Sequence, residues 1–125
     1  MVPLSRIRLE LARNPDFPEG STVHGYDIIA PLDSQGKLDE RAWKKLHQLC
    51  RVQRFWKGEE DKVGRLARKP GGVWFVDYDP KTDADDEPGF RFGSHVFRSG
   101  EYVSIREHDG VPRTFRVVSV VDYAP

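Results

Sequence analysis

The segment from Phe90 to Val121 constrains the fold most, because nearly every pattern in it is typical of antiparallel sheet. Its apolar residues are mostly β-branched or aromatic, which suits a pleated surface. They are Tyr102, Val103, Ile105, Phe115, Val117, Val118, Val120 and Val121. Ser99-Gly100 and His108-Asp109-Gly110 supply turn residues, and an Asp-Gly pair tolerates the positive φ of a tight hairpin. We therefore expect a three-strand meander in this segment.

Alternation of apolar and polar residues predicts further strands upstream. From Arg6 to Leu11, apolar residues alternate with charged ones, as in a half-buried strand. The other predicted strands span residues 23–32, 52–56, 63–69 and 73–79. The residues expected to face the core are Ile7, Leu9, Leu11, Tyr26, Ile28, Ala30, Trp74, Val76, Tyr78, Val103 and Ile105.

One helix is predicted from about Asp39 to Cys50. Asp39 is a good N-cap, because its carboxylate can accept a hydrogen bond from an N–H of the first turn. Leu38 and Trp43 stand at the two positions of a hydrophobic staple. Four residues at helical spacing form the expected apolar face, namely Trp43, Leu46, His47 and Cys50.

These elements predict a mainly β (α+β) single domain over residues 1–125, with about eight strands and one helix near residues 39–50. Short turns between the strands favour antiparallel pairing. A sheet of this size in a small chain should curl or close, because closure removes exposed strand edges. We expect an antiparallel barrel-like or strongly bent sheet, with the helix covering an end or an edge.

The single cysteine, Cys50, excludes an intramolecular disulfide and agrees with a reducing compartment. The N-terminal residues carry charges throughout and contain no apolar core of signal-peptide length. No run approaches the roughly 18 apolar residues of a membrane span. We therefore expect a soluble cytoplasmic protein without a membrane partner.

The net charge is zero, but the charges are unevenly placed. Residues 41–69 contain ten Lys and Arg against three carboxylates, whereas residues 77–87 contain six carboxylates against Lys81. Such blocks are usually solvated faces. Within the basic block, Arg51 to Lys57 interleaves cations with aromatics, and only one of the adjacent Phe55 and Trp56 can point inward from a strand.

The best functional hypothesis from these patterns is a small non-enzymatic binding module for a protein or a small ligand. The alternative partner is single-stranded nucleic acid, with phosphates on cations and bases stacked on rings. The candidate binding surface consists of Arg41, Lys44, Lys45, Arg51, Arg54, Phe55, Trp56, Arg65 and Arg68.

Catalytic and metal motifs are weak in this sequence. The four histidines, His24, His47, His95 and His108, have no typical ligand spacing with each other or with Cys50. A further alternative is an enzyme that uses His95 and His108 with nearby carboxylates. We expect no cofactor and no transition metal.

The acidic segment that follows residue 77 departs from the EF-hand loop pattern. Lys81 takes a ligand position, Thr82 replaces the glycine and Pro88 replaces the bidentate glutamate. A solvated loop is the favoured interpretation. A different calcium site remains the alternative, formed by Asp83, Asp85, Asp86 and Glu87.

Five segments together show a resemblance to a known family. They are CRVQRFW, GGVWFVDYD, FRFGSHVF, GEYVSIREHDG and TFRVVSV. This set resembles an uncharacterised family of small bacterial proteins with no known function. The resemblance implies bacterial origin and a single-domain protein, and it implies no activity, cofactor or catalytic residue.

Overall fold

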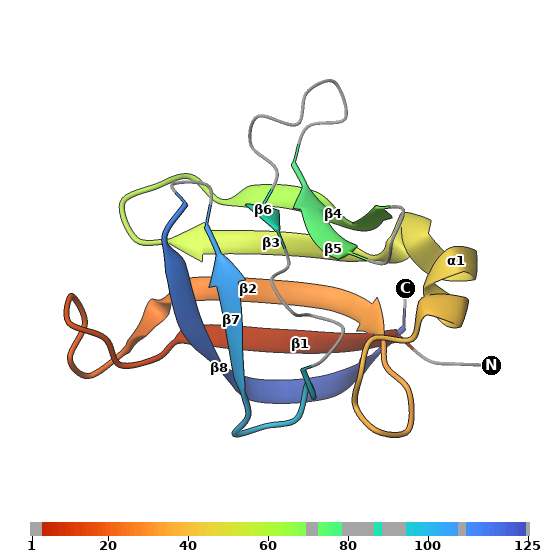
Figure 1. Cartoon of the computed structure of the whole chain (residues 1–125), viewed down its shortest axis with the longest axis horizontal. Helices are drawn as coiled ribbons and strands as arrows, with labels where there is room; N and C mark the ends of the chain where they lie inside the picture. Colours follow the sequence, from red (N-terminus) through yellow and green to blue (C-terminus); the bar gives the residue numbers. More distant parts are fainter. Residues whose placement is uncertain (1–3, 70–72, 79–86, 89–94, 108–109, 125) are drawn as a thin grey trace.

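The backbone of this protein forms a single antiparallel sheet in a computed structural model that describes residues 4–69, 73–78, 87–88, 95–107 and 110–124. The strand order is β6-β5-β4-β3-β2-β1-β8-β7 (Figure 1). The strands are β1 (Leu4–Leu11), β2 (Ser21–Pro31), β3 (Arg51–Trp56), β4 (Lys62–Lys69), β5 (Val73–Asp77), β6 (Glu87–Pro88), β7 (Tyr102–Arg106) and β8 (Pro112–Tyr123). The predicted mainly β fold with one helix is confirmed.

The strand count needs a small correction. Within the described residues, seven strands have five residues or more, and β6 contributes only two residues. The edge strands β6 and β7 approach each other, although they are not hydrogen-bonded neighbours. The sheet is therefore a curled, partly open barrel.

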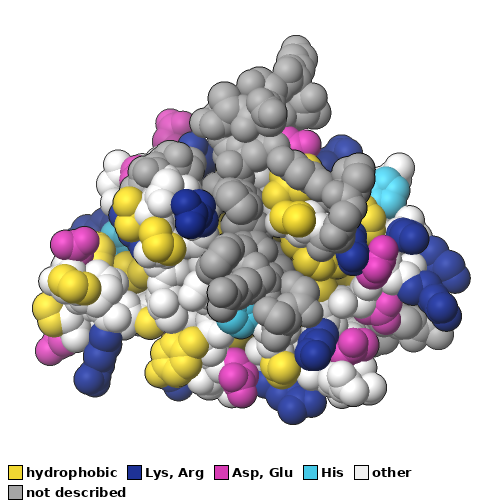
Figure 2. All heavy atoms as spheres, in the orientation of Figure 1, with side chains coloured by type: hydrophobic (Ala, Val, Ile, Leu, Met, Phe, Trp, Pro, Cys, Tyr) yellow, Lys and Arg dark blue, Asp and Glu magenta, His cyan; other side chains and the backbone are white. Residues whose placement is uncertain are grey.

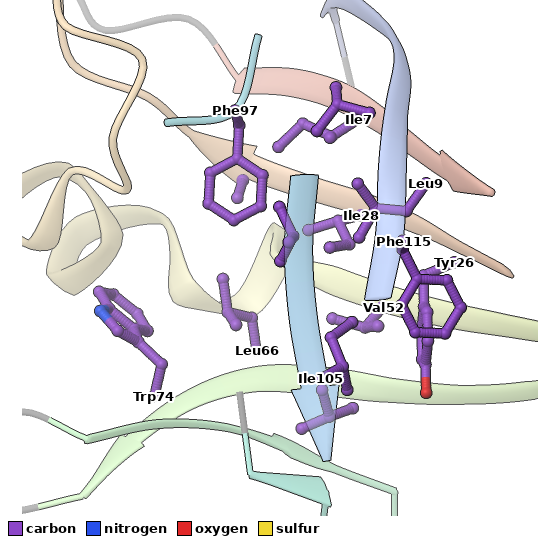
Figure 3. Close-up of a cluster of buried hydrophobic side chains, with 14 of the residues drawn as sticks. Ile7, Leu9, Tyr26, Ile28, Val52, Leu66, Trp74, Phe97, Ile105 and Phe115 are labelled. Atoms are coloured by element: carbon purple, nitrogen blue, oxygen red, sulfur yellow. The ribbon is translucent and has the colours of Figure 1, made fainter. Parts of the chain in front are cut away.

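Every strand of five or more residues sends alternate side chains into one shared interior (Figure 3). Buried members include Ile7, Leu9, Tyr26, Ile28, Val52, Leu66, Trp74, Val76, Val103, Ile105, Phe115 and Val117. The predicted inward faces are thus confirmed. Tyr78 is only half-buried, because β5 ends before it at Asp77.

The helix begins as predicted and ends earlier. In α1 (Glu40–Leu46), the carboxylate of Asp39 accepts a hydrogen bond from the Ala42 N–H at 3.0 Å. Leu46 leaves helical geometry, and a 3₁₀ turn (His47–Leu49) leads the chain into β3. The regular α-helix therefore ends at Leu46, short of the predicted end near Cys50, although the 3₁₀ turn continues to Leu49. His47 is predicted on the apolar face, and its ring lies 5.7 Å from that of Trp43 without being buried. The tighter turn leaves His47 exposed.

The helix lies against one end of the barrel (Figure 1). Its Trp43 ring meets the Trp74 ring edge-on at 5.4 Å. The Trp43 indole N–H donates to the Leu66 carbonyl at 2.9 Å. No helix in the described part of the chain is long and apolar enough to cross a membrane.

The predicted meander is confirmed for its last two strands, β7 and β8, which pair as an antiparallel hairpin. Gly100 and Gly110 have φ values of 95° and 80°, as turns there require. The predicted first strand is not found at residues 95–98, which are irregular. The rest of that strand, together with His108 and Asp109, lies outside the described residues, as does the acidic segment 79–86.

Candidate functional site

The residues predicted as one binding surface are divided between the two sides of the sheet. Side chains alternate along β3, so Val52 and Arg54 point into the barrel and are buried. Arg51, at the helix end of the same strand, is exposed. The continuous stretch of sequence therefore does not form a continuous surface.

Arg54 lies inside the barrel and is bound to a carboxylate. Its Nε is 3.0 Å from Oε2 of Glu107, and both side chains are buried. The hydroxyl of Tyr26 donates to the same oxygen, and Nη1 of Arg113 is 3.4 Å from Oε1. A second guanidinium nitrogen of Arg54 lies 3.1 Å from Glu59. This charge is therefore compensated within the protein and cannot serve an external ligand.

Trp56 completes this interior cluster. The Arg54 guanidinium lies 4.3 Å from the centre of its ring, and the His24 ring meets it edge-on at 4.5 Å. His24 is buried, and its Nδ1 lies 2.5 Å from the Ser21 hydroxyl. Burial, and then the nearby charges of Arg54 and Lys57, lower the pKa of His24 below its usual 6.5. The cluster fills one end of the barrel.

Phe55 points to the outer side, where it lies over a glycine. A Cβ at Gly25 would be 2.8 Å from the Phe55 ring and 2.0 Å from the Leu9 carbonyl. The Arg8 guanidinium lies 4.4 Å from the centre of the same ring. The prediction that one of Phe55 and Trp56 points outward is confirmed, but an arginine lies over each ring.

The helix cations are exposed at the opposite end from Trp56. Lys44 is 3.7 Å from Glu40, and Arg68 is 2.9 Å from the same carboxylate. Arg68 also lies 5.0 Å from the Trp74 ring centre. On the face that Figure 2 shows, basic and acidic side chains intermingle where α1 lies. Arg41, Lys44 and Lys45 therefore do not extend a uniformly basic surface.

Two arginines of the predicted surface do lie together on the outer side. Arg51 of β3 and Arg65 of β4 are direct cross-strand partners, and both are exposed. Among the described residues, no carboxylate lies within 4.0 Å of either guanidinium. Like charges directly opposite each other destabilise a sheet. Asp77 of β5 is the cross-strand partner of Arg65 on its other side and is the nearest strand partner that can offset this charge. One carboxylate therefore stands beside two guanidinium groups, which leaves a net positive site.

The arginine pair borders a hollow of about 350 Å³. The remaining lining residues are Val63, Gly64, Asp77 and Tyr78. A second hollow of about 270 Å³ adjoins it and shares Arg51 and Val63. Its other lining residues are Arg6, Asp27, Ile29, Gln53 and Tyr123. We call the two hollows together the outer trough.

Only Arg51 and Arg65 of the trough belong to the surface predicted from the sequence. Alternation along β1 and β5 places Arg6 and Asp77 on the outer side, so the sequence pattern could have assigned both residues to this face. Tyr123 reaches the trough because β8 pairs with β1, with Leu4 opposite Tyr123. Nothing local in the sequence indicates that pairing.

The predicted alternatives for chemistry find little support in the described residues. No group of three or more His, Cys, Asp or Glu side chains there could hold a metal ion. Burial raises the pKa of the Cys50 thiol to about 11, which favours an inert thiol. Glu107 directly precedes His108 and is therefore one of the nearby carboxylates of the enzyme alternative. Its carboxylate binds Tyr26 and two arginines. The calcium alternative falls on residues 83–86, outside the described part, and on the side chain of Glu87, which is not described either.

Comparison with protein-family models, with curated proteins and with solved structures finds no match for this chain. The arginine pair of the outer trough is then the observation that bears most directly on function.

Proposed function

We propose that this protein is a binding module that recognises a phosphate-bearing ligand through Arg51 and Arg65 on the outer side of the sheet. The observation that carries the proposal is the direct opposition of these two exposed guanidinium groups without a carboxylate within 4.0 Å among the described residues. A phosphate group removes that repulsion, because its oxygens accept paired hydrogen bonds from guanidinium groups.

The hollow beside the pair suits a small ligand group. Its volume of about 350 Å³ is within the usual range for small-molecule sites, roughly 300–1,000 Å³. Val63 and Tyr78 supply apolar wall next to the cations. Gly64 allows this wall to form, because a Cβ there would lie 2.8 Å from the Tyr78 ring.

Recognition rather than catalysis fits the chemistry of the pair. A guanidinium stays protonated in proteins, so it donates hydrogen bonds and does not accept a proton. Two fixed donors of this kind orient an anion and neutralise its charge. They do not by themselves supply a nucleophile or a general base.

The test is a titration of the purified protein with inorganic phosphate and pyrophosphate at low salt, followed by amide chemical shifts. Arg51→Gln and Arg65→Gln should each weaken binding about tenfold or more, because a hydrogen bond to a charged group contributes about 1.5–3 kcal/mol. Arg41→Gln is the matched control, since it removes an exposed arginine of α1. Equal affinity in the Arg51 and Arg41 variants would contradict the proposal.

A further inference from the structure

We infer that the natural ligand of the outer trough is a single-stranded nucleic acid that crosses the strands through both hollows. This inference rests on the proposed function and deepens it, because it names the ligand class. Its starting point is that the two hollows are adjacent and share two lining residues, Arg51 and Val63.

The two hollows have matching compositions. The first contains an arginine, an aspartate and a tyrosine, namely Arg65, Asp77 and Tyr78. The second contains the same three residue types, namely Arg6, Asp27 and Tyr123. Arg51 borders both. Such a duplicated arrangement fits a ligand built from repeating units, each with one anionic group and one flat ring.

The cations follow one row across the sheet. Arg6 lies opposite Ile29, and Arg51 lies opposite Arg65. The β2–β3 register, continued by one residue from Ile28 and Val52, places Ile29 opposite Arg51. From β1 to β4 the row spans three strand spacings, or roughly 14 Å. This distance equals about four nucleotides of a stacked strand and fewer of an extended one, whereas a single phosphate group does not reach across it.

Apolar and aromatic groups lie between and beside these cations. Tyr78 and Tyr123 are half-buried, one in each hollow, and Val63 between them is 55% exposed. Bases stack on aromatic side chains whatever their sequence. Tyr123 replaces Phe55 and Trp56 as the candidate stacking ring, because Arg8 and Arg54 lie over the latter two. Tyr78 is less suited to this role, since Lys62 Nζ lies 5.8 Å from the centre of its ring.

The aspartates favour nucleic acid over an acidic peptide. Asp27 and Asp77 each line one hollow and are half-buried, and the enclosed Oδ1 of Asp27 lies 3.9 Å from Arg6 Nε. Amino groups of bases donate to carboxylates, whereas the side chains of a polyacidic peptide bring only further acceptors. Arg8 compensates the charge of Asp27 as well, since its Nη1 lies 3.3 Å from Oδ2 of Asp27. A polynucleotide therefore brings amino groups that can donate to these carboxylates and phosphates that can accept from the arginines.

The test measures how affinity depends on ligand length. A fluorescein-labelled cytosine hexadeoxynucleotide is titrated by anisotropy at low salt, with unlabelled phosphate, mononucleotide and dinucleotide as competitors. Affinity should rise from the mononucleotide to the hexamer. Engagement of Arg6, Arg51 and Arg65 should give a slope of about −2 for log K against log salt.

Variants of the second hollow separate the inference from the proposed function. Tyr123→Ala should weaken hexamer binding roughly 5- to 150-fold, as expected for one lost stacked base, and Arg6→Gln should lower the salt slope. Both should leave phosphate affinity unchanged, because neither residue lines the first hollow. Tyr102→Ala is the matched control, because this tyrosine is 57% exposed on β7. Thermal melting confirms that each variant is folded.

Three outcomes would overturn the inference in different ways. If the hexamer binds no tighter than the mononucleotide, or if the Tyr123 and Tyr102 variants behave alike, the ligand is small and the proposed function stands. If a glutamate decapeptide competes as well as the hexamer and Tyr123→Ala has no effect, the partner is an acidic peptide. If neither phosphate nor hexamer responds to Arg51→Gln, both the inference and the proposed function are wrong.

Discussion

Arg54 and Glu107 are separated by 53 positions in the sequence, and they form a buried ion pair at 3.0 Å inside the barrel. Glu107 directly follows β7, so the pair ties that edge strand to β3 in the middle of the sheet. Tyr26 of β2 donates to the same carboxylate. Arg54, which the sequence suggested as a ligand contact, therefore links strands of the sheet instead.

Glu107→Gln should destabilise the protein by about 3–5 kcal/mol, because it leaves buried guanidinium groups without their carboxylate. The measurement is urea unfolding at neutral pH. Glu59→Gln is the control, since that carboxylate is 47% exposed and also contacts Arg54. The control should lose no more than about 1 kcal/mol. Equal losses in the free energy of unfolding would show that the buried carboxylate of Glu107 contributes no more to stability than the exposed one of Glu59.

Stability should fall as the pH drops below about 6.5, through protonation of His24. Its pKa in the folded protein is lowered, chiefly by burial and then by Arg54, so the unfolded chain binds this proton more readily. The contribution of neutral His24 is complete above the unfolded pKa of 6.5 and is lost as the pH falls toward the folded pKa.

The measurement for His24 is a series of urea midpoints between pH 7.5 and 5. His24→Gln should show a shallower decline than the wild type. His47→Gln should follow the wild-type curve, because this side chain is exposed beside the helix. If the urea midpoint of His24→Gln falls with pH as steeply as that of the wild type, His24 is not the cause of the loss of stability at low pH.

Trp74→Ala should cost about 3–5 kcal/mol of stability. The indole is only 4% exposed and packs edge-on against Trp43, where it joins the barrel to α1. Val73→Ala, one residue earlier, removes a side chain that is 55% exposed and should change stability by no more than about 0.5 kcal/mol. Thermal unfolding of the two variants compares the two sides of β5 directly, and similar melting temperatures would contradict the assigned inward face.

Cys50 should resist alkylation in the folded protein. With a pKa of about 11, its thiolate is a very small fraction at pH 8, and the side chain is fully buried. Iodoacetamide should therefore label the native protein far more slowly than the protein in 8 M urea. Intact mass after timed quenching gives both rates, and rapid labelling of the native form would show that the β3 end opens readily.

Alternation was a sufficient signal for the inward faces of the strands, because each strand carries its own pattern. It was ambiguous for Arg54, which lies in phase with Val52 and Trp56. A charged residue in phase with apolar ones can be buried only with a counter-ion, and Glu107 is distant in the sequence. The burial of Arg54 therefore depends on a tertiary contact that local patterns do not contain.

The trough was partly predictable for a similar reason. Arg51 and Arg65 belong to the basic block, but their opposition depends on the β3–β4 register. Arg6 and Tyr123 meet the same trough through the pairing of the first and last strands. Composition therefore indicated a cationic region, and register decided which of its cations lie together.

The glycine beneath Phe55 also has a consequence for folding. Gly25 and Phe55 are direct partners across β2 and β3, and the ring occupies the space that a side chain at position 25 would need. Slippage of β3 by two residues would instead place this ring opposite Val23 or Asp27, where a side chain already stands. The absence of a side chain at position 25 therefore favours the observed register of β2 and β3 over registers shifted by two residues as the sheet forms.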